Sequence, residues 1–596
     1  MRALPIAVLL SAPVLAQPAI DLNQMGFSPG APRMAVVRGA GDAPLDWELV
    51  DSSGKVRLSG KSRQLGPDVA AGQSLQRIDF SGQVPEGRYR LRAGGTTSPA
   101  FAIADGLDAP LARDALHYFY HNRSHVPIEA RFVGERWARP AGHPHEEVGC
   151  FAGVDARGNR WPGCDWTLDA TGGWYDAGDH GKYVVNGGIS LWTLLNLHEL
   201  LPAAFPDGSM AIPEAGNGIS DLLDEARVQM EWMLRMQVPQ GKRMQLPLNQ
   251  PDGTKPLRLS PVDAGGMAHH KLADVQWTRL PLRPDQDRGP RFLYPPSTAA
   301  TLNLVATAAQ CVRVWKQIDP AFSARCLAAA ERGWDAAERN PAIYANWDFP
   351  GSGGYGDADL SDEFYWAAAE LFATTGADRY RQALLASPHF ARIDGEPGWP
   401  STAPLGTITL AMEPHGLTAN EQAALRRSIV AAADRFAAER DSNGYGVPFA
   451  GRSYAWGSNA VLLNRALLMG MAHRLDADPR HLRPMRDVLD YLLGRNPMGT
   501  SYVSGYGERA MQNPHHRFWA HGLDPAFPPP PPGVLSGGPN NRAMSDEVAA
   551  KMQGHCAPQA CWADDVHAFA LNEVTINWNA PLVWVATYVD MAGPRP

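Results

Sequence analysis

Residues 219–234 read ISDLLDEARVQMEWML and indicate the class of the fold. Apolar side chains recur in this stretch at spacings of three and four: Ile219, Leu222, Leu223, Ala226, Met230, Met233 and Leu234. This spacing places them on one face of an α-helix. We therefore predict an amphipathic helix here, with its apolar stripe packed against a core.

Comparable stripes lie on both sides of this segment, at residues 191–201, 298–314, 364–374, 421–438, 460–472 and 485–493. About a dozen helices of this kind fit between residues 108 and 596, so the fold class is predicted to be mainly α. Long Gly/Pro-rich loops interrupt them at 140–175, 240–295 and 495–560. Long loops in a compact helical domain usually carry function.

The pattern before residue 105 is different. Short β-rich runs occur at 34–38, 47–50, 56–59, 75–80, 88–92 and 100–103, separated by turn clusters. Their spacing is typical of an immunoglobulin-like sandwich. We expect a small all-β domain that supports the structure and takes no part in catalysis.

The net charge of −8 and the pI near 6.1 provide no basic surface for nucleic acid or for an anionic membrane. The partner is therefore expected to be neutral. Eighteen Trp and sixteen Tyr fit a sugar-binding cleft, because pyranose rings stack on aromatic faces.

The first residues are typical of an export signal. Arg2 precedes an apolar run at 7–15, and Ala16 ends a small-residue cleavage site. We expect a secreted protein, periplasmic or extracellular, that is monomeric and has no membrane span.

The six cysteines form three local pairs among the fifteen connectivities that six cysteines allow. Disulfides are predicted for two of these pairs, Cys311/Cys326 and Cys556/Cys561. Because Cys311 and Cys326 lie on consecutive predicted helices, their bond would link a helical hairpin. The remaining pair, Cys150/Cys164, stays open between a disulfide and metal binding.

Two segments hold the candidate chemistry. Residues 172–180, GGWYDAGDH, place Asp176 and Asp179 three residues apart among glycines that allow close approach of a ligand. Both carboxylates could face one water and activate it. Glu573 is almost the only charge in the apolar, amide-rich stretch 569–582, so its carboxyl group is expected to be desolvated and protonated. Capping aspartates and a satisfied buried glutamate are the structural alternatives.

Together these groups match the two-carboxylate scheme of glycosidic bond hydrolysis. The strings GGWYDAGDHGKY, GRNPMGTSYVSGYG, NPHHRFW and NEVTINWNAPL resemble ordered blocks of the family-nine glycoside hydrolases, the cellulase family. The resemblance implies an (α/α)6 barrel at 106–596, an immunoglobulin-like sandwich at 17–105 and a signal peptide at 1–16.

The resemblance also implies roles for individual residues. Asp179 would be the base, Asp176 would help hold the water, and Glu573 would be the acid of an inverting endo-β-1,4-glucanase. His515 and Arg517 resemble residues that contact the sugar at the cleavage point. Further substrate contacts are expected, with weaker support for the last two, at Trp578, Trp456 and Tyr506.

Two metal sites follow from the same resemblance, although the chemistry itself needs no cofactor. Some members bind zinc where this chain has Cys150, Cys164, Asp165 and His180, and zinc accepts a carboxylate in place of the usual histidine. The acidic string Asp357, Asp359, Asp362 and Glu363 resembles a calcium site. A solvated helix start is the alternative for these acids.

Other functions compete with the endoglucanase prediction. An exo-acting enzyme of the β-glucosidase or glucosaminidase type, acting on oligosaccharides or xyloglucan, uses the same chemistry. A silent glycan-binding protein is disfavoured because all three carboxyl groups are present. A polysaccharide lyase on a similar helical fold rests on analogy alone, and lyases need a positive cleft that this composition does not provide. The sequence also lacks G-x-S-x-G and H-E-x-x-H.

Overall fold

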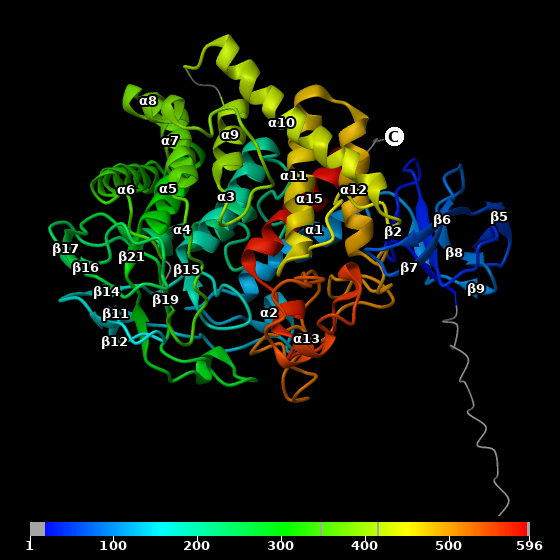
Figure 1. The fold of residues 1–596 in the computed structure, drawn as a ribbon, viewed down its shortest axis with the longest axis horizontal. Coiled ribbons are helices and arrows are strands. Elements are labelled where there is room, and N and C mark those ends of the chain that lie inside the picture. Colours follow the sequence, from blue (N-terminus) through cyan, green and yellow to red (C-terminus); the bar gives the residue numbers. More distant parts are fainter. Residues whose placement is uncertain (1–17, 346–347, 414–415, 593–596) are drawn as a thin grey trace, which may run out of the picture.

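The computed structural model describes residues 18–345, 348–413 and 416–592. A β-rich domain, blue in Figure 1, lies at one side of a larger helical domain. The predicted signal segment lies outside the described residues. No helix in the described part of the chain has the length and apolarity needed to cross a membrane.

The amino-terminal domain is a sandwich of two sheets. One sheet has the strand order β1-β3-β7-β6, and the other has β2-β10-β8-β4-β5 with β9 beside β8. Phe27 from β2 packs edge-on against Phe80 and Phe101 with ring centroids 5.4 and 5.6 Å apart. The strands are Ala19–Asp21, Gly26–Phe27, Met34–Arg38, Asp46–Asp51, Val56–Lys61, Arg63–Asp68, Gln73–Asp79, Gly87–Ala93, Thr96–Thr97 and Phe101–Ile103, numbered β1 to β10. The predicted immunoglobulin-like sandwich is confirmed.

The helical domain is an (α/α)6 barrel, which confirms the predicted fold class. Its inner helices are buried on almost every side: α3 Val184–Leu200, α5 Thr298–Trp315, α7 Ser361–Thr375, α9 Ala403–Met412, α11 Ser458–Asp476 and α15 Ile576–Ala592. They are mostly apolar because an inner helix has little surface toward water.

Each inner helix packs against a more polar outer helix. The outer helices are α1 Asp108–His121, α4 Asp221–Arg235, α6 Pro320–Arg339, α8 Asp378–Ala386, α10 Ala419–Glu439 and α12 Pro479–Leu492. The segment 219–234 is α4, and its apolar stripe faces the barrel as predicted.

The long loops gather at one end of the helices, where they carry short strands and helical turns (Figure 1). A three-stranded sheet of β15 Lys182–Tyr183, β19 Lys271–Asp274 and β20 Arg291–Leu293 follows the 172–180 segment. The other short elements are α2 Ala130–Val133, β11 Glu147–Gly149, β12 Ala152–Val154, β13 Arg160–Pro162, β14 Thr167–Asp169, β16 Arg243–Leu246, β17 Ser260–Asp263, β18 Ala268–His269, β21 Pro296–Ser297, α13 Glu547–Met552 and α14 Phe569–Asn572.

The β-sandwich docks on residues 490–499, which include the start of the block GRNPMGTSYVSGYG. Gln24 donates its backbone N–H to Leu493 O at 3.0 Å and its side-chain amide to Gly499 O at 3.0 Å. Asn23 donates to Asp490 Oδ1 at 2.9 Å. This segment is one of the contacts between the domains, and residues 441–445 form another through Arg77 and Asp21.

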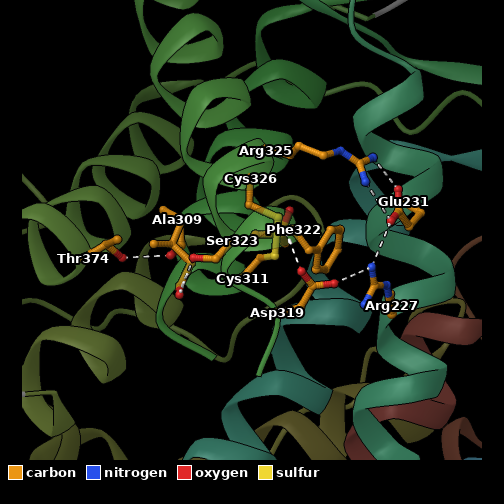
Figure 2. The surroundings of a disulfide bond; sticks show 12 residues. Arg227, Glu231, Ala309, Cys311, Asp319, Phe322, Ser323, Arg325, Cys326 and Thr374 are labelled. Carbon is orange, nitrogen blue, oxygen red and sulfur yellow. Dashed lines mark hydrogen bonds and ion pairs between the residues drawn. A yellow bond between two sulfur atoms is a disulfide. The ribbon is translucent and has the colours of Figure 1, made fainter. Parts of the chain in front are cut away.

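The predicted disulfides Cys311–Cys326 and Cys556–Cys561 are both confirmed. Figure 2 shows that Cys311–Cys326 joins α5 to α6 next to ion pairs that tie the hairpin to α4. These pairs are Arg227–Asp319 at 2.9 Å and Arg325–Glu231 at 2.6 Å. The bond closes a loop between neighbouring helices and so restricts the unfolded chain.

Candidate active site

Backbone hydrogen bonds join the three segments that carry the predicted site. Ile576 N donates to Asp176 O, and Arg517 N donates to Gly178 O, both at 2.9 Å. His515 N donates to Asn572 O, the residue before Glu573, also at 2.9 Å. Segments almost 400 residues apart in sequence therefore meet through main-chain contacts.

Gly178 permits this close approach. A Cβ added there would lie 2.1 Å from His515 O and 3.2 Å from His516 Cα. No L side chain fits so close to another backbone, so glycine is required at this position. The glycines of this segment therefore allow another backbone, and not only a ligand, to come close.

Asp176, Asp179 and Glu573 line one cavity of about 380 Å³. The remaining wall is largely aromatic and glycine-rich: Ala177, Tyr183, Trp277, Gly353, Gly354, Tyr355, Trp399, Trp456, Asn577 and Trp578. A larger cavity of about 550 Å³ lies between the two domains, but none of the three carboxyl groups lines it. The smaller cavity is therefore the candidate active site.

Asp176 is fully buried and held by two neutral donors. Asn186 Nδ2 lies 3.0 and 3.1 Å from its two oxygens, and the Tyr355 hydroxyl donates to Oδ2 at 2.8 Å. Burial raises the pKa of Asp176 to about 7 and nearby Asp179 adds to the rise, while both donors oppose it. The carboxyl group is thus fixed in direction and carries its charge only from the neutral range upward.

The other two carboxyl groups differ in their surroundings. Burial raises the pKa of Asp179, and the nearby Arg517 guanidinium opposes this rise. Burial raises the pKa of Glu573 well above its ordinary value, and the charges of Asp179 and Asp176 raise it further. Glu573 is therefore the group most inclined to hold a proton while Asp179 is ionised.

Most of the residues predicted to contact the substrate lie at or beside the cavity, and one does not. Trp456 and Trp578 line the cavity, and Trp456 is 38% exposed. His515 and Arg517 adjoin it, with Arg517 Nη1 at 3.1 Å from His515 Nε2. Tyr506 does not line this cavity, and its hydroxyl donates to Asp114 on α1 at 2.7 Å, so a substrate contact there stays a prediction.

Several cavity residues were not predicted from the sequence: Tyr183, Trp277, Tyr355, Trp399 and Asn577. Tyr355 lies in the glycine-rich string 351–356, which resembles a nucleotide-binding pattern by letters only. Its φ of +48° is rare outside glycine, and this strain is a signal that only coordinates reveal.

Of the two alternatives left open for Cys150 and Cys164, the disulfide is confirmed, and the zinc site with Asp165 and His180 is wrong. Cys150 and Cys164 form a disulfide, so neither supplies a thiolate. Asp165 is exposed and forms a surface ion pair. Burial lowers the pKa of His180 to about 4, although its hydrogen bond to Asp287 opposes the shift.

The calcium site predicted in the acidic string is corrected at one residue. Asp357, Asp362 and Glu363 bring carboxylate oxygens within 4.8 Å of one another, but Asp359 lies outside this cluster. Asp359 Oδ1 instead accepts hydrogen bonds from the backbone and hydroxyl of Ser361 at 3.0 and 2.6 Å. In the cluster, both Glu363 oxygens are buried without a hydrogen-bond partner, as are Asp357 Oδ2 and Asp362 Oδ1. Hard oxygen donors left unsatisfied in this way fit a calcium ion.

A helical barrel with three carboxyl groups in one aromatic-lined cavity is the arrangement expected of a glycoside hydrolase. Residues 109–586 match the model for glycosyl hydrolase family 9, and residues 15–98 match that for the cellulase N-terminal ig-like domain. The chain belongs to glycosyl hydrolase family 9, as the sequence blocks predicted.

Individual relatives agree with this assignment. The chain is 40% identical to a cellulose 1,4-beta-cellobiosidase of Acetivibrio thermocellus, over 97% of this chain and 68% of that protein. It is 42% identical to endoglucanase C of Cellulomonas fimi, over 97% of this chain but only 52% of that protein. A metagenome-derived family 9 endoglucanase structure superposes with a TM-score of 0.82 at 32% identity, covering 96% of this chain and 99% of that one.

Proposed function

We propose that the protein is an inverting endo-β-1,4-glucanase that hydrolyses cellulose or a related β-glucan. The observation that carries this proposal is the single cavity lined by Asp176, Asp179 and Glu573. The similarity to an endoglucanase and to a family 9 endoglucanase structure supports the substrate class. The chain spans about half the length of endoglucanase C. The proposed substrate class therefore also rests on the residues that line the cavity.

In the proposed reaction, ionised Asp179 removes a proton from a water molecule held by Asp176. The water oxygen attacks the anomeric carbon while the bond to the leaving sugar breaks. Glu573 gives its proton to the departing oxygen. The raised pKa of Glu573 keeps that proton available, and Arg517 helps to keep Asp179 ionised. Attack opposite the leaving group inverts the anomeric configuration.

The aromatic walls account for recognition of a neutral polysaccharide. Trp277, Trp399, Trp456 and Trp578 present flat faces on which pyranose rings can stack. Arg517 provides a fixed donor beside the carboxyl groups for sugar hydroxyls, and His515 holds it by accepting a hydrogen bond from its Nη1. We infer that the partner is a glucan chain and that the enzyme acts as a monomer.

We further propose the division into a signal peptide at 1–16, a sandwich at 17–105 and a catalytic domain at 106–596, with the mature protein secreted. The family 9 chemistry needs no cofactor. Calcium held by Asp357, Asp362 and Glu363 would anchor the segment that places Tyr355 against Asp176.

The catalytic proposal is tested by Glu573→Gln, which keeps the shape of the side chain and removes its acidic proton. Loss of a general acid lowers kcat by about 10²–10⁴-fold. Glu508→Gln, at an exposed glutamate far from the cavity, is the matched control. Equal activity of Glu573→Gln and wild type, with both folded by circular dichroism, would exclude Glu573 as the acid.

The stereochemistry and cleavage mode need separate measurements. NMR of the first product formed from a β-glucan should show the α-anomer, and an initial β-anomer would contradict inversion. On carboxymethyl cellulose, an endo-acting enzyme lowers viscosity steeply while releasing few reducing ends. Release of short sugars without this fall would instead support the exo-acting alternative.

A further inference from the structure

Two histidines and an aspartate from separate loops meet close to the catalytic segment. His143, His180 and Asp287 bring one potential ligand atom each within 4.8 Å of the others. His180 Nδ1 lies 2.8 Å from Asp287 Oδ2, and His143 Nε2 lies 3.5 Å from the same oxygen. His180 directly follows Asp179, so this cluster is next to the proposed base.

Asp287 is buried without a cationic side chain to balance it. Its residue is 7% exposed, and its side-chain oxygens contact the two imidazoles and the backbone N–H of Gly289. Among the described residues, no lysine or arginine forms an ion pair with Asp287. The nearby Arg291 is engaged by Glu146 and Asp274 at 2.8 and 2.9 Å. A buried carboxylate in this situation is normally paired or bound to a metal.

The two imidazole rings each keep one nitrogen free for an ion. Nδ1 of His143 lies 2.6 Å from the Tyr175 hydroxyl, and Nδ1 of His180 lies against Asp287, which is itself a member of the cluster. In each ring, Nε2 is buried and has no hydrogen-bond partner. Metal-binding histidines usually have one nitrogen fixed in this way, which orients the ring and leaves the other nitrogen for the ion.

We propose that His143, His180 and Asp287 bind a divalent transition-metal ion of the zinc class. Two ligands at 2.0–2.1 Å from a tetrahedral ion lie about 3.4 Å apart, and His143 Nε2 lies 3.5 Å from Asp287 Oδ2. Two imidazoles and one carboxylate also suit zinc or cobalt better than calcium. Water would complete the coordination.

Such an ion would tie the loops that carry His143 and Asp287 to the segment that carries the base. This ligand set shares only His180 with the disproved cysteine site. The inference does not depend on the proposed function, because metal binding is measured without substrate.

The test uses the full chain, freed of metal with a chelator and kept under non-reducing conditions so that the disulfides stay intact. Cobalt(II) is titrated while its visible absorption is recorded, and zinc(II) is then added as a competitor. We expect one tight site in the wild type. His143→Gln and Asp287→Asn should each weaken binding at least about tenfold, which is the loss expected even for outer groups of a metal site.

The matched control is His145→Gln, an exposed histidine two positions from His143, which should bind like the wild type. Glu363→Gln should also bind like the wild type, because the acidic cluster is separate. Circular dichroism of the metal-free variants checks that they are folded. Absence of binding in the wild type would overturn the proposal, as would unchanged binding in both ligand variants or binding only after the disulfides are reduced.

Discussion

Gly178→Ala tests whether contact between two backbones places the proposed base. The new Cβ would lie 2.1 Å from His515 O, whereas real Cβ atoms essentially never approach another heavy atom closer than 3.0 Å. The two segments must therefore separate by about 1 Å. Because the obstacle is main chain, rotation of a side chain cannot relieve the overlap.

The expected cost follows from that displacement. Overpacking of a filled site destabilises a protein by about 1–3 kcal/mol. Moving a catalytic group by about 1 Å lowers the rate by about 100-fold. Asp179 directly follows Gly178, so kcat should fall by about this factor while the chain remains folded.

The assay combines initial rates on a soluble β-glucan with thermal unfolding. Gly395→Ala is the matched control, because its added Cβ meets no atom within 4 Å. That control should keep both its activity and its Tm. Activity of Gly178→Ala within twofold of the wild type, with an unchanged Tm, would refute the reasoning.

Three further predictions concern protons and calcium. The activity should follow a bell-shaped pH profile, with the acid limb set by Asp179 and the alkaline limb by Glu573, because burial raises the pKa of both groups, that of Glu573 the more. Arg517→Gln removes a charge that lowers the pKa of Asp179, so the acid limb of kcat/KM should move to higher pH; an unmoved limb would contradict this role. Removal of calcium with a chelator should lower the Tm of the wild type and of Asp359→Asn but leave that of Glu363→Gln unchanged, because an ion at 100 times its Kd stabilises by about 2.7 kcal/mol. Equal chelator effects in all three proteins would exclude calcium from this cluster.

Local patterns were enough to predict most elements of the fold. The stripe at 219–234 forms α4, and the run at 34–38 forms β3 with the same bounds. The periods of a helix and a strand are properties of neighbouring residues, so they can be read without knowing the tertiary structure. The small strands inside the long loops were missed because their pairing depends on contacts distant in sequence.

The sequence by itself determined which residues could perform acid–base chemistry, since Asp176, Asp179 and Glu573 stand in distinctive local surroundings. Only the tertiary structure decided what lies around them. In the folded chain, Tyr355 donates a hydrogen bond to Asp176 and Asp359 lies outside the acidic cluster. Cys150 forms a disulfide and does not bind a metal. The physical reason is that side-chain chemistry and local periodicity belong to a short stretch of chain, whereas burial, pKa and ligand geometry arise where distant segments pack together.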